Sequence, residues 1–237
     1  MMTKLSYLND TYLFESVANF VEIKENEKGR AVILDETIFY PQGGGQPADK
    51  GEITSGDIVF SVSDVRLDED GTVWHFGEFK NGEFKKGDKV VLKIDKDRRV
   101  LNAKLHSAGH LLDCAVSTTN IENLHPTKGF HFPDGPYVEY DGMIENPAEV
   151  IPVLQKNLDD LISQNLTVER KDLSPEEARS KGVYAPEGKA ARVVNFAGFP
   201  ACGCGGTHVN NASEIGGITI RKIKSNQGKT RIAYLVA

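Results

Sequence analysis

The five residues HSAGH, at positions 106–110, set two histidines four residues apart within a longer stretch of helical character. Apolar residues recur at helical spacing from Asp97 to about Ser117, so we predict a helix over this stretch. Residues at i and i+4 share one face of a helix, and His106 and His110 can therefore hold one metal ion from the same side. By itself such a pair is weak evidence for a metal site.

A second string, CGGTH at positions 204–208, adds a cysteine and another histidine at the same spacing. Three imidazole nitrogens and one thiolate suit tetrahedral zinc better than calcium or magnesium, which prefer oxygen ligands. We therefore predict a zinc site made by His106, His110, Cys204 and His208. The role of Cys202 stays open between an alternative ligand, a neighbour of the ligands and an ordinary turn residue.

The sequence before the helix is typical of a small β-barrel or sandwich. Short β-type runs alternate with turns that end on glycine. The expected strands are Phe20–Ile23, Arg30–Leu34, Ile58–Val65, Val73–Phe76 and Lys89–Ile94. We predict an α+β protein with an N-terminal β-barrel domain at residues 1–95 and a zinc-containing α+β domain at residues 96–237.

The second half mixes helices and strands. Asn146 and Pro147 suit the start of a helix with one apolar face, within which Pro152 leaves the first turn uncertain. Ser174 and Glu177 have the spacing of a capping box, which predicts a second, short helix. Strand and turn are expected over 129–140, and further strands over 192–195, 218–224 and 230–236.

A glycine-rich stretch in the first half, FYPQGGGQPADKG at positions 39–51, has neither the Walker spacing nor a GxGxxG pattern. Consecutive glycines let the main chain approach a ligand or another segment closely. The alternative is a flexible turn between strands. We favour a specific packing or substrate-facing role for Gly43, Gly44, Gly45 and Gln46.

Composition limits the function classes. The 237 residues are 39% hydrophobic and 26% charged, and no apolar run approaches the roughly 20 residues that cross a bilayer. No signal peptide is recognisable, and three cysteines without a disulfide pattern suit a reducing compartment, so we expect a cytoplasmic protein without membrane partners. A net charge of −6 argues against indiscriminate coating of nucleic acid, but it leaves room for a local basic patch that binds tRNA.

Together, the segment around GGGQPADKG, the HSAGH string and CGGTHVNNASEIGGITI resemble the editing region of alanyl-tRNA synthetases. They also resemble its free-standing relatives, the AlaX-type alanyl-tRNA editing proteins. The resemblance covers almost the entire chain, and CGGTH is its most specific element. Threonyl-tRNA synthetases share the plan of histidines and cysteine but ordinarily differ around the cysteine, so the alanine type is favoured.

The resemblance implies a trans-acting hydrolase that cleaves the ester of tRNA for alanine mischarged with serine, Ser-tRNA(Ala), or with glycine. A charging pocket built for alanine cannot strongly reject an analogue that differs by one hydroxyl or methyl group, so a second hydrolytic sieve is needed. In the family, a Gln or Thr after the HxxxH helix is associated with substrate recognition, and Thr127 is the nearest match here. No charging region or long coiled coil is recognisable, as expected for a free-standing editor.

Two other functions remain open from the sequence. A closed four-ligand zinc ion can merely stabilise a tRNA-binding module, or the chain can be a metallohydrolase of small esters or amides. Whether the zinc ion is structural or catalytic is not predicted, and neither is the oligomeric state. His131, Asp134 and Glu139 are expected to be surface or framework residues rather than catalytic ones.

Overall fold

The computed structural model describes residues 2–119, 121, 123–181, 183 and 191–237. The chain divides into two compact units, Met1–Leu101 and Asn102–Ala237. Helix α1 (Lys96–Ser117) begins in the first unit and continues into the second, as the predicted helix over 97–117 requires. The domain boundary between residues 95 and 96 stays a prediction. Within the described residues, no helix is long and apolar enough to cross a membrane.

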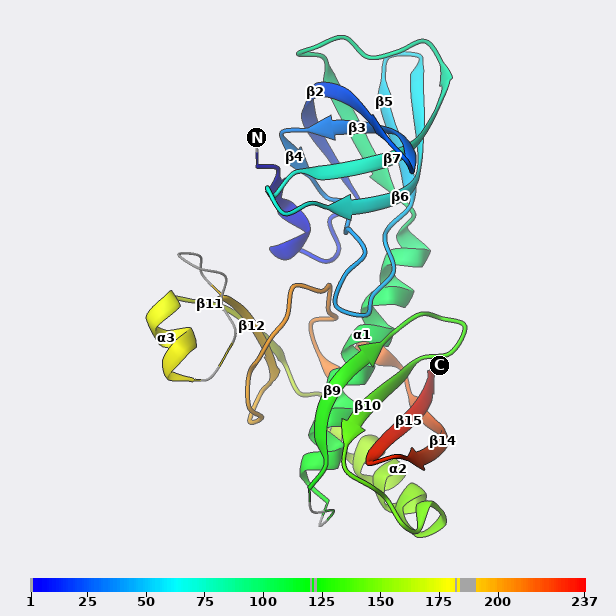
Figure 1. The fold of residues 1–237 in the computed structure, drawn as a ribbon, viewed down its shortest axis with the longest axis vertical. Helices are drawn as coiled ribbons and strands as arrows, with labels where there is room; N and C mark the ends of the chain where they lie inside the picture. The colour runs from blue at the N-terminus through cyan, green and yellow to red at the C-terminus, as the bar shows by residue number, and fades with distance from the viewer. Residues whose placement is uncertain (1, 120, 122, 182, 184–190) are drawn as a thin grey trace. The chain divides into compact units, whose positions relative to one another are not determined.

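The first unit is a closed six-stranded barrel, as the sequence predicts (Figure 1). Around the barrel the strands follow the order β2-β3-β7-β6-β5-β8, and each neighbouring pair is antiparallel. Alternate residues point inward, as in β8, where Val90, Leu92 and Ile94 are buried. The strands are β2 (Glu15–Asn26), β3 (Gly29–Leu34), β5 (Gly51–Ser55), β6 (Ile58–Leu67), β7 (Val73–Asn81) and β8 (Lys89–Ile94).

Strand β5 was not predicted from the sequence, because only Ile53 of its five residues is buried. It nevertheless closes the barrel by pairing with both β6 and β8. A Cβ atom on Gly51 would lie 2.1 Å from the carbonyl oxygen of Lys93, so this close approach of strands needs glycine. Two short strands, β1 (Lys4–Leu5) and β4 (Glu36–Thr37), pair with each other in parallel, and the 3-10 turn η1 (Ser6–Leu8) follows β1.

The second unit contains a four-stranded sheet in the order β14-β15-β10-β9 and a three-stranded sheet in the order β11-β12-β13. The strands of the first are β9 (His125–Phe130), β10 (Tyr137–Asp141), β14 (Ile218–Asn226) and β15 (Lys229–Val236). Those of the second are β11 (Val168–Leu173), β12 (Ala191–Phe196) and β13 (Cys202–Gly203). The short η2 turn (Ala212–Ile215) precedes β14.

Helix α2 (Pro147–Ser163) packs on β14 through one apolar face, which buries Leu154, Leu158 and Leu161. The side chain of Gln155 fixes this packing, because its amide donates to the carbonyl of Ile218 and accepts the N–H of Ile220. Apolar residues of α1 from Leu105 onward, among them Leu111 and Leu112, lie in the core of this unit.

Both predicted helix starts are confirmed in position, but only one of them has a side-chain cap. Asn146 is the N-cap of α2, yet its backbone carbonyl rather than its side chain accepts the N–H of Glu149. In α3 (Pro175–Ser180) both bonds of the predicted capping box form between Ser174 and Glu177.

Candidate metal centre

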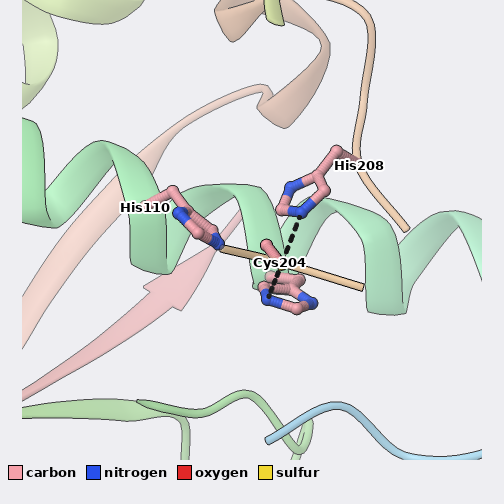
Figure 2. A group of neighbouring side chains, drawn as sticks. His110, Cys204 and His208 are labelled. Carbon is pink, nitrogen blue, oxygen red and sulfur yellow. Dashed lines mark hydrogen bonds between the residues drawn. The ribbon is translucent and has the colours of Figure 1, made fainter. Parts of the chain in front are cut away.

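The second unit brings four metal-binding side chains together from two segments far apart in the sequence. Helix α1 carries His106 and His110 one turn apart, with their rings stacked. The loop after β13 carries Cys204 and His208, and Figure 2 shows both of them beside His110. One ligand atom from each of these residues, which we call the His/Cys cluster, lies within 4.8 Å of all the others. The four residues singled out by spacing therefore converge on one point and can hold a metal ion.

Cys204 contacts two of the three histidines of the cluster. Its Sγ lies 3.4 Å from His106 Nε2 and 3.2 Å from His208 Nε2. The ring centroids of His106 and His208 are 4.6 Å apart, and those of His110 and His208 are 4.8 Å apart. Donor atoms this close to one another suit coordination to a common ion.

Burial keeps the three histidines of the cluster neutral. It lowers the pKa of His106 and of His208 well below the usual value, with a smaller contribution from neighbouring histidines. It lowers the pKa of His110 to about 4, helped by the positive charge of Arg192. Neutral imidazole is the form that ligates a metal, so the histidines are poised for binding at neutral pH.

Opposing effects act on the pKa of the Cys204 thiol. Burial raises its pKa, while the N–H of Gly206, 3.4 Å from Sγ, and the nearby Arg192 act to lower it. Arg192 also fixes the loop, since its guanidinium donates to the carbonyls of Cys204 at 2.6 Å and of Gly206 at 3.1 Å. A bound cation would favour the thiolate, the form that coordinates metals.

Contacts from outside the cluster orient His208. Its Nδ1 lies 3.2 Å from Ser107 Oγ, which accepts the N–H of Val209 at 3.1 Å. Arg170 donates to the carbonyls of His208 and Val209. When Nδ1–H donates to Ser107, Nε2 is the nitrogen that remains for a metal, which is the usual arrangement around ligating histidines.

His131 is a buried framework residue stacked on His106 of the cluster, with ring centroids 4.6 Å apart. Tyr234 donates its hydroxyl to the carbonyl of Leu105, so it accepts the Nδ1–H of His131 at 2.7 Å. A Cβ on Gly109 would come within 2.3 Å of the His131 ring, and glycine is therefore required where the ring meets α1.

The other two residues that the sequence analysis called surface or framework differ from each other. Asp134 is exposed, whereas Glu139 is buried and paired with Lys229 and Arg231. Neither belongs to the His/Cys cluster.

Cys202 lies beside the cluster. Its Sγ is 3.3 Å from Nδ1 of His110, and its thiol carries a pKa raised to about 12 by burial although the residue as a whole is exposed. Of the roles left open by the sequence, the structure therefore favours that of a neighbour of the His/Cys cluster, which contacts His110.

A cavity of about 290 Å³ opens next to the cluster and is bordered by His110 and Cys202. Apolar side chains dominate its wall, with Asp113, Tyr140 and Asn195 among the polar contributors. The remaining lining residues are Cys114, Val116, Ser117, Thr119, Ile121, Leu124, Pro126, Val194, Phe196, Pro200 and Ala201. A mostly apolar cavity with a few polar groups is the usual form of a small-molecule site.

The predicted substrate-binding residue Thr127 lies on β9 and is exposed. Its hydroxyl donates to the carbonyl of Glu139 at 3.1 Å. It does not line the cavity, although its neighbour Pro126 does. A role of Thr127 in substrate binding stays a prediction.

The glycine-rich stretch forms a tight turn in the first unit. Gly43 and Gln46 form an antiparallel bridge, and the two residues between them, Gly44 and Gly45, have φ values of 51° and 76°. Two central residues with positive φ are typical of a type I′ turn, which explains the need for glycine. Gln46 is fully buried, and a substrate-facing role for these four residues stays a prediction.

Family models match both parts of the chain. Residues 5–98 match the model of class II (A) tRNA synthetases, and residues 191–233 match that of the threonyl and alanyl tRNA synthetase second additional domain. The second match contains Cys204 and His208 of the His/Cys cluster.

Individual relatives agree with these matches. The alanyl-tRNA editing protein AlaX-M of Pyrococcus horikoshii is 32% identical over 98% of this chain and 96% of its own length. AlaX-L of the same organism is 32% identical over 98% of this chain, which spans only 58% of that protein. The alanine–tRNA ligase of Clostridioides difficile is 29% identical over 86% of this chain, which corresponds to 25% of the ligase. The chain therefore belongs to the AlaX-type family of alanyl-tRNA editing proteins.

Proposed function

We propose that this protein is a zinc-dependent aminoacyl-tRNA deacylase that cleaves Ser-tRNA(Ala) in trans and spares Ala-tRNA(Ala). The observation that carries the proposal is the convergence of His106, His110, Cys204 and His208 beside a cavity of small-molecule size, in a chain of the alanyl-tRNA editing family. Tyr140 and Asp113 add polar groups to the wall of that cavity. A cytoplasmic location is part of the proposal.

The donor set supports zinc as the metal. Three nitrogens and one sulfur match the ligands that tetrahedral zinc takes in proteins, whereas calcium and magnesium prefer oxygen. When bound, a zinc ion supplies a Lewis acid at the border of the cavity. Ser107 and Arg170 hold His208 and its loop, and Arg192 holds the loop of Cys204, so the ligands keep their places before the ion arrives.

The number of protein ligands separates two roles for zinc. Four ligands are typical of a closed structural site, whereas hydrolytic zinc ordinarily keeps one position for water. In the first role, zinc organises the cavity wall and the ester is attacked by a water molecule held by other groups. In the second role, substrate replaces one of the four protein ligands. Both roles require the cluster to be intact, and they differ in whether hydrolysis changes when another tetrahedral ion replaces zinc.

Selectivity follows from the hydroxyl of serine. A charging site for alanine cannot reject serine strongly, whereas an editing site with a polar group placed for the hydroxyl leaves that group unpaired when alanine binds. Such an unpaired buried group costs roughly 1–3 kcal/mol. Thr127 remains the residue we propose for this contact; because it is exposed on β9, the penalty applies only when bound substrate covers it.

The test is hydrolysis of Ser-tRNA(Ala) and Ala-tRNA(Ala) by purified full-length protein, in zinc-loaded, cobalt-substituted and metal-free forms. We expect zinc-loaded protein to release serine rapidly and to leave the alanyl ester intact, and metal-free protein to be inactive. Equal rates with zinc and cobalt indicate a structural ion. Altered rates at equal occupancy indicate that the ion takes part in the reaction.

The alternative functions predict different outcomes. Binding of tRNA without release of either amino acid would instead show a zinc-stabilised binding module. Hydrolysis of small esters without any effect of tRNA would show a small-molecule metallohydrolase. Either result contradicts the deacylase proposal.

A further inference from the structure

Asp113 is a titratable group in the wall of the cavity, and it is not part of the His/Cys cluster. It lies on α1, three residues after the ligand His110, and both side chains border the cavity. Its Oδ1 accepts the hydroxyl of Tyr140 at 2.6 Å. Within the described part of the chain, this is the one hydrogen bond that Asp113 makes, and no cation pairs with it.

The surroundings of Asp113 leave its negative charge uncompensated. Burial raises its pKa to about 7, against which only the bond from Tyr140 acts. Tyr140 itself is fully buried, and it joins β10 to α1 at this point. Asp113 is half-buried. A carboxylate withdrawn from water without a cationic partner is costly, and such groups are usually paired or serve at a binding site. In this cavity a ligand is the available source of a positive charge.

The chemistry of an aminoacyl ester fits this wall. Every amino acid esterified to tRNA carries a free α-ammonium group two bonds from the ester carbonyl. Residues three apart on a helix have Cβ atoms about 5–6 Å apart, so one small acyl group can reach both His110 and Asp113. The apolar remainder of the cavity suits the uncharged parts of the ligand.

We propose that Asp113 binds the α-ammonium group of the aminoacyl ester and selects esters with a free amine over N-acylated ones. The inference rests on the proposed deacylase function and deepens it. Asp113 does not distinguish serine from alanine, since both carry the amine. It makes the site selective for aminoacyl-tRNA against peptidyl-tRNA or N-blocked tRNA, in which the charge is absent.

The test uses a pair of ligands that cannot be hydrolysed: 3′-deoxy-3′-(L-serylamino)adenosine and its N-acetyl derivative. Their Kd values are measured by calorimetry on zinc-loaded full-length protein, with Asp113→Asn as the variant. Asp134→Asn, at an exposed position of the same unit, is the matched control. Zinc content and thermal unfolding of each variant are recorded alongside.

We expect the wild-type protein and Asp134→Asn to bind the free amine about 10- to 100-fold more tightly than the N-acetyl ligand, which is the effect of one charge-assisted hydrogen bond. Asp113→Asn is expected to lose this preference while it keeps its zinc. A preference retained in Asp113→Asn, or absent in wild type, overturns the inference. If Asp113→Asn does not fold, the ratio of the two Kd values is measured in Asp113→Glu instead. The ratio in the wild-type protein can still overturn the inference by itself.

Hydrolysis of Ser-tRNA(Ala) by the same wild-type preparation separates this inference from the proposed function. Hydrolysis without preference for the free amine refutes the role of Asp113 alone. Absence of both hydrolysis and ligand binding refutes the deacylase function and the inference with it.

Discussion

Each unit buries histidine in its interior, and the two sets of partners differ. In the barrel, His75 donates from Nδ1 to the carbonyl of Val32 at 2.9 Å and accepts the hydroxyl of Thr37 at Nε2 at 2.7 Å. In the second unit, nitrogens of His106 and His208 face the sulfur of Cys204 instead. A buried polar group with a full set of local partners is typical of structure, whereas donors that converge on one point indicate a ligand site.

A similar contrast separates two carboxylates, the buried Asp49 of the first unit and the half-buried Asp113 of the second. Asp49 in the first unit receives the guanidinium of Arg99 and the N–H of Tyr40. Asp113 in the second unit receives only the hydroxyl of Tyr140 among the residues that the structure describes. Asp49 is thus compensated by a partner within the protein. For Asp113 and the His/Cys cluster we expect the partners to be a substrate and a metal ion.

Replacement of Cys204 should have the largest effect. Cys204→Ala removes the one sulfur donor of the His/Cys cluster and leaves three imidazoles, so we expect loss of stoichiometric zinc and of Ser-tRNA(Ala) hydrolysis. The measurements are metal analysis and single-turnover deacylation. Cys114→Ala, which alters a cysteine outside the cluster, is the control and should keep its zinc. A Cys204→Ala protein with full zinc content and full activity contradicts the assigned site.

The buried ion pair of the barrel, Arg99 with Asp49, gives a second test. Arg99→Met leaves Asp49 buried without its charge partner and also removes the bond to the carbonyl of Thr11. We expect a loss of about 3–5 kcal/mol in the free energy of unfolding of the first unit. Urea unfolding followed by fluorescence of Trp74, the single tryptophan of the chain and a residue of β7, measures this loss. The double variant Arg99→Met/Asp49→Asn should recover part of it, and zinc content should not change.

The pH dependence of the barrel gives a third test. Burial lowers the pKa of His75 to about 4 in the folded protein, against 6.5 for an ordinary histidine. Between pH 4 and 6.5 the unfolded chain binds a proton at His75 that the folded chain does not. The free energy of unfolding is therefore highest above pH 6.5 and falls as the pH drops toward 4. The expected loss is about 3 kcal/mol. Urea unfolding read by Trp74 at several pH values measures it, and the slope should be weaker in His75→Gln. An equal slope in that variant contradicts the assignment.

Cys202 should show the smallest effect, because it contacts His110 but lies outside the His/Cys cluster. Cys202→Ala removes the sulfur 3.3 Å from Nδ1 of His110. Loss of such an outer contact typically costs about 10- to 100-fold in metal affinity. Competition with a chelator measures this affinity, with Cys114→Ala again as the control. Complete loss of zinc from Cys202→Ala would show that Cys202 is itself a ligand and would change the assigned set of ligands.

Local sequence patterns predicted the parts of the protein that depend on neighbours along the chain. The period-2 runs predicted the barrel, and the helical period predicted α1 with its two histidines in register. The capping box predicted the start of α3. The spacing of CGGTH predicted which residues accompany the histidines, because few side chains other than cysteine and histidine suit such a site.

Contacts between distant residues could not be predicted in this way. Strand β5 has a single buried side chain and is held by its two neighbours, so it shows no pattern of its own. The pairs Arg99–Asp49, Tyr140–Asp113 and Tyr234–His131 join segments 27 to 103 residues apart. Nothing in the local sequence marks such partners, since they are chosen by the tertiary fold.

The central claim is that the His/Cys cluster, rather than any buried group of the barrel, binds the functional metal ion. Cobalt substitution tests it most directly, because a cobalt–thiolate bond gives a charge-transfer absorption band. We predict one cobalt ion per chain with a thiolate band that disappears in Cys204→Ser, while unfolding of the barrel read by Trp74 is unchanged. A thiolate band that persists in Cys204→Ser would contradict the account.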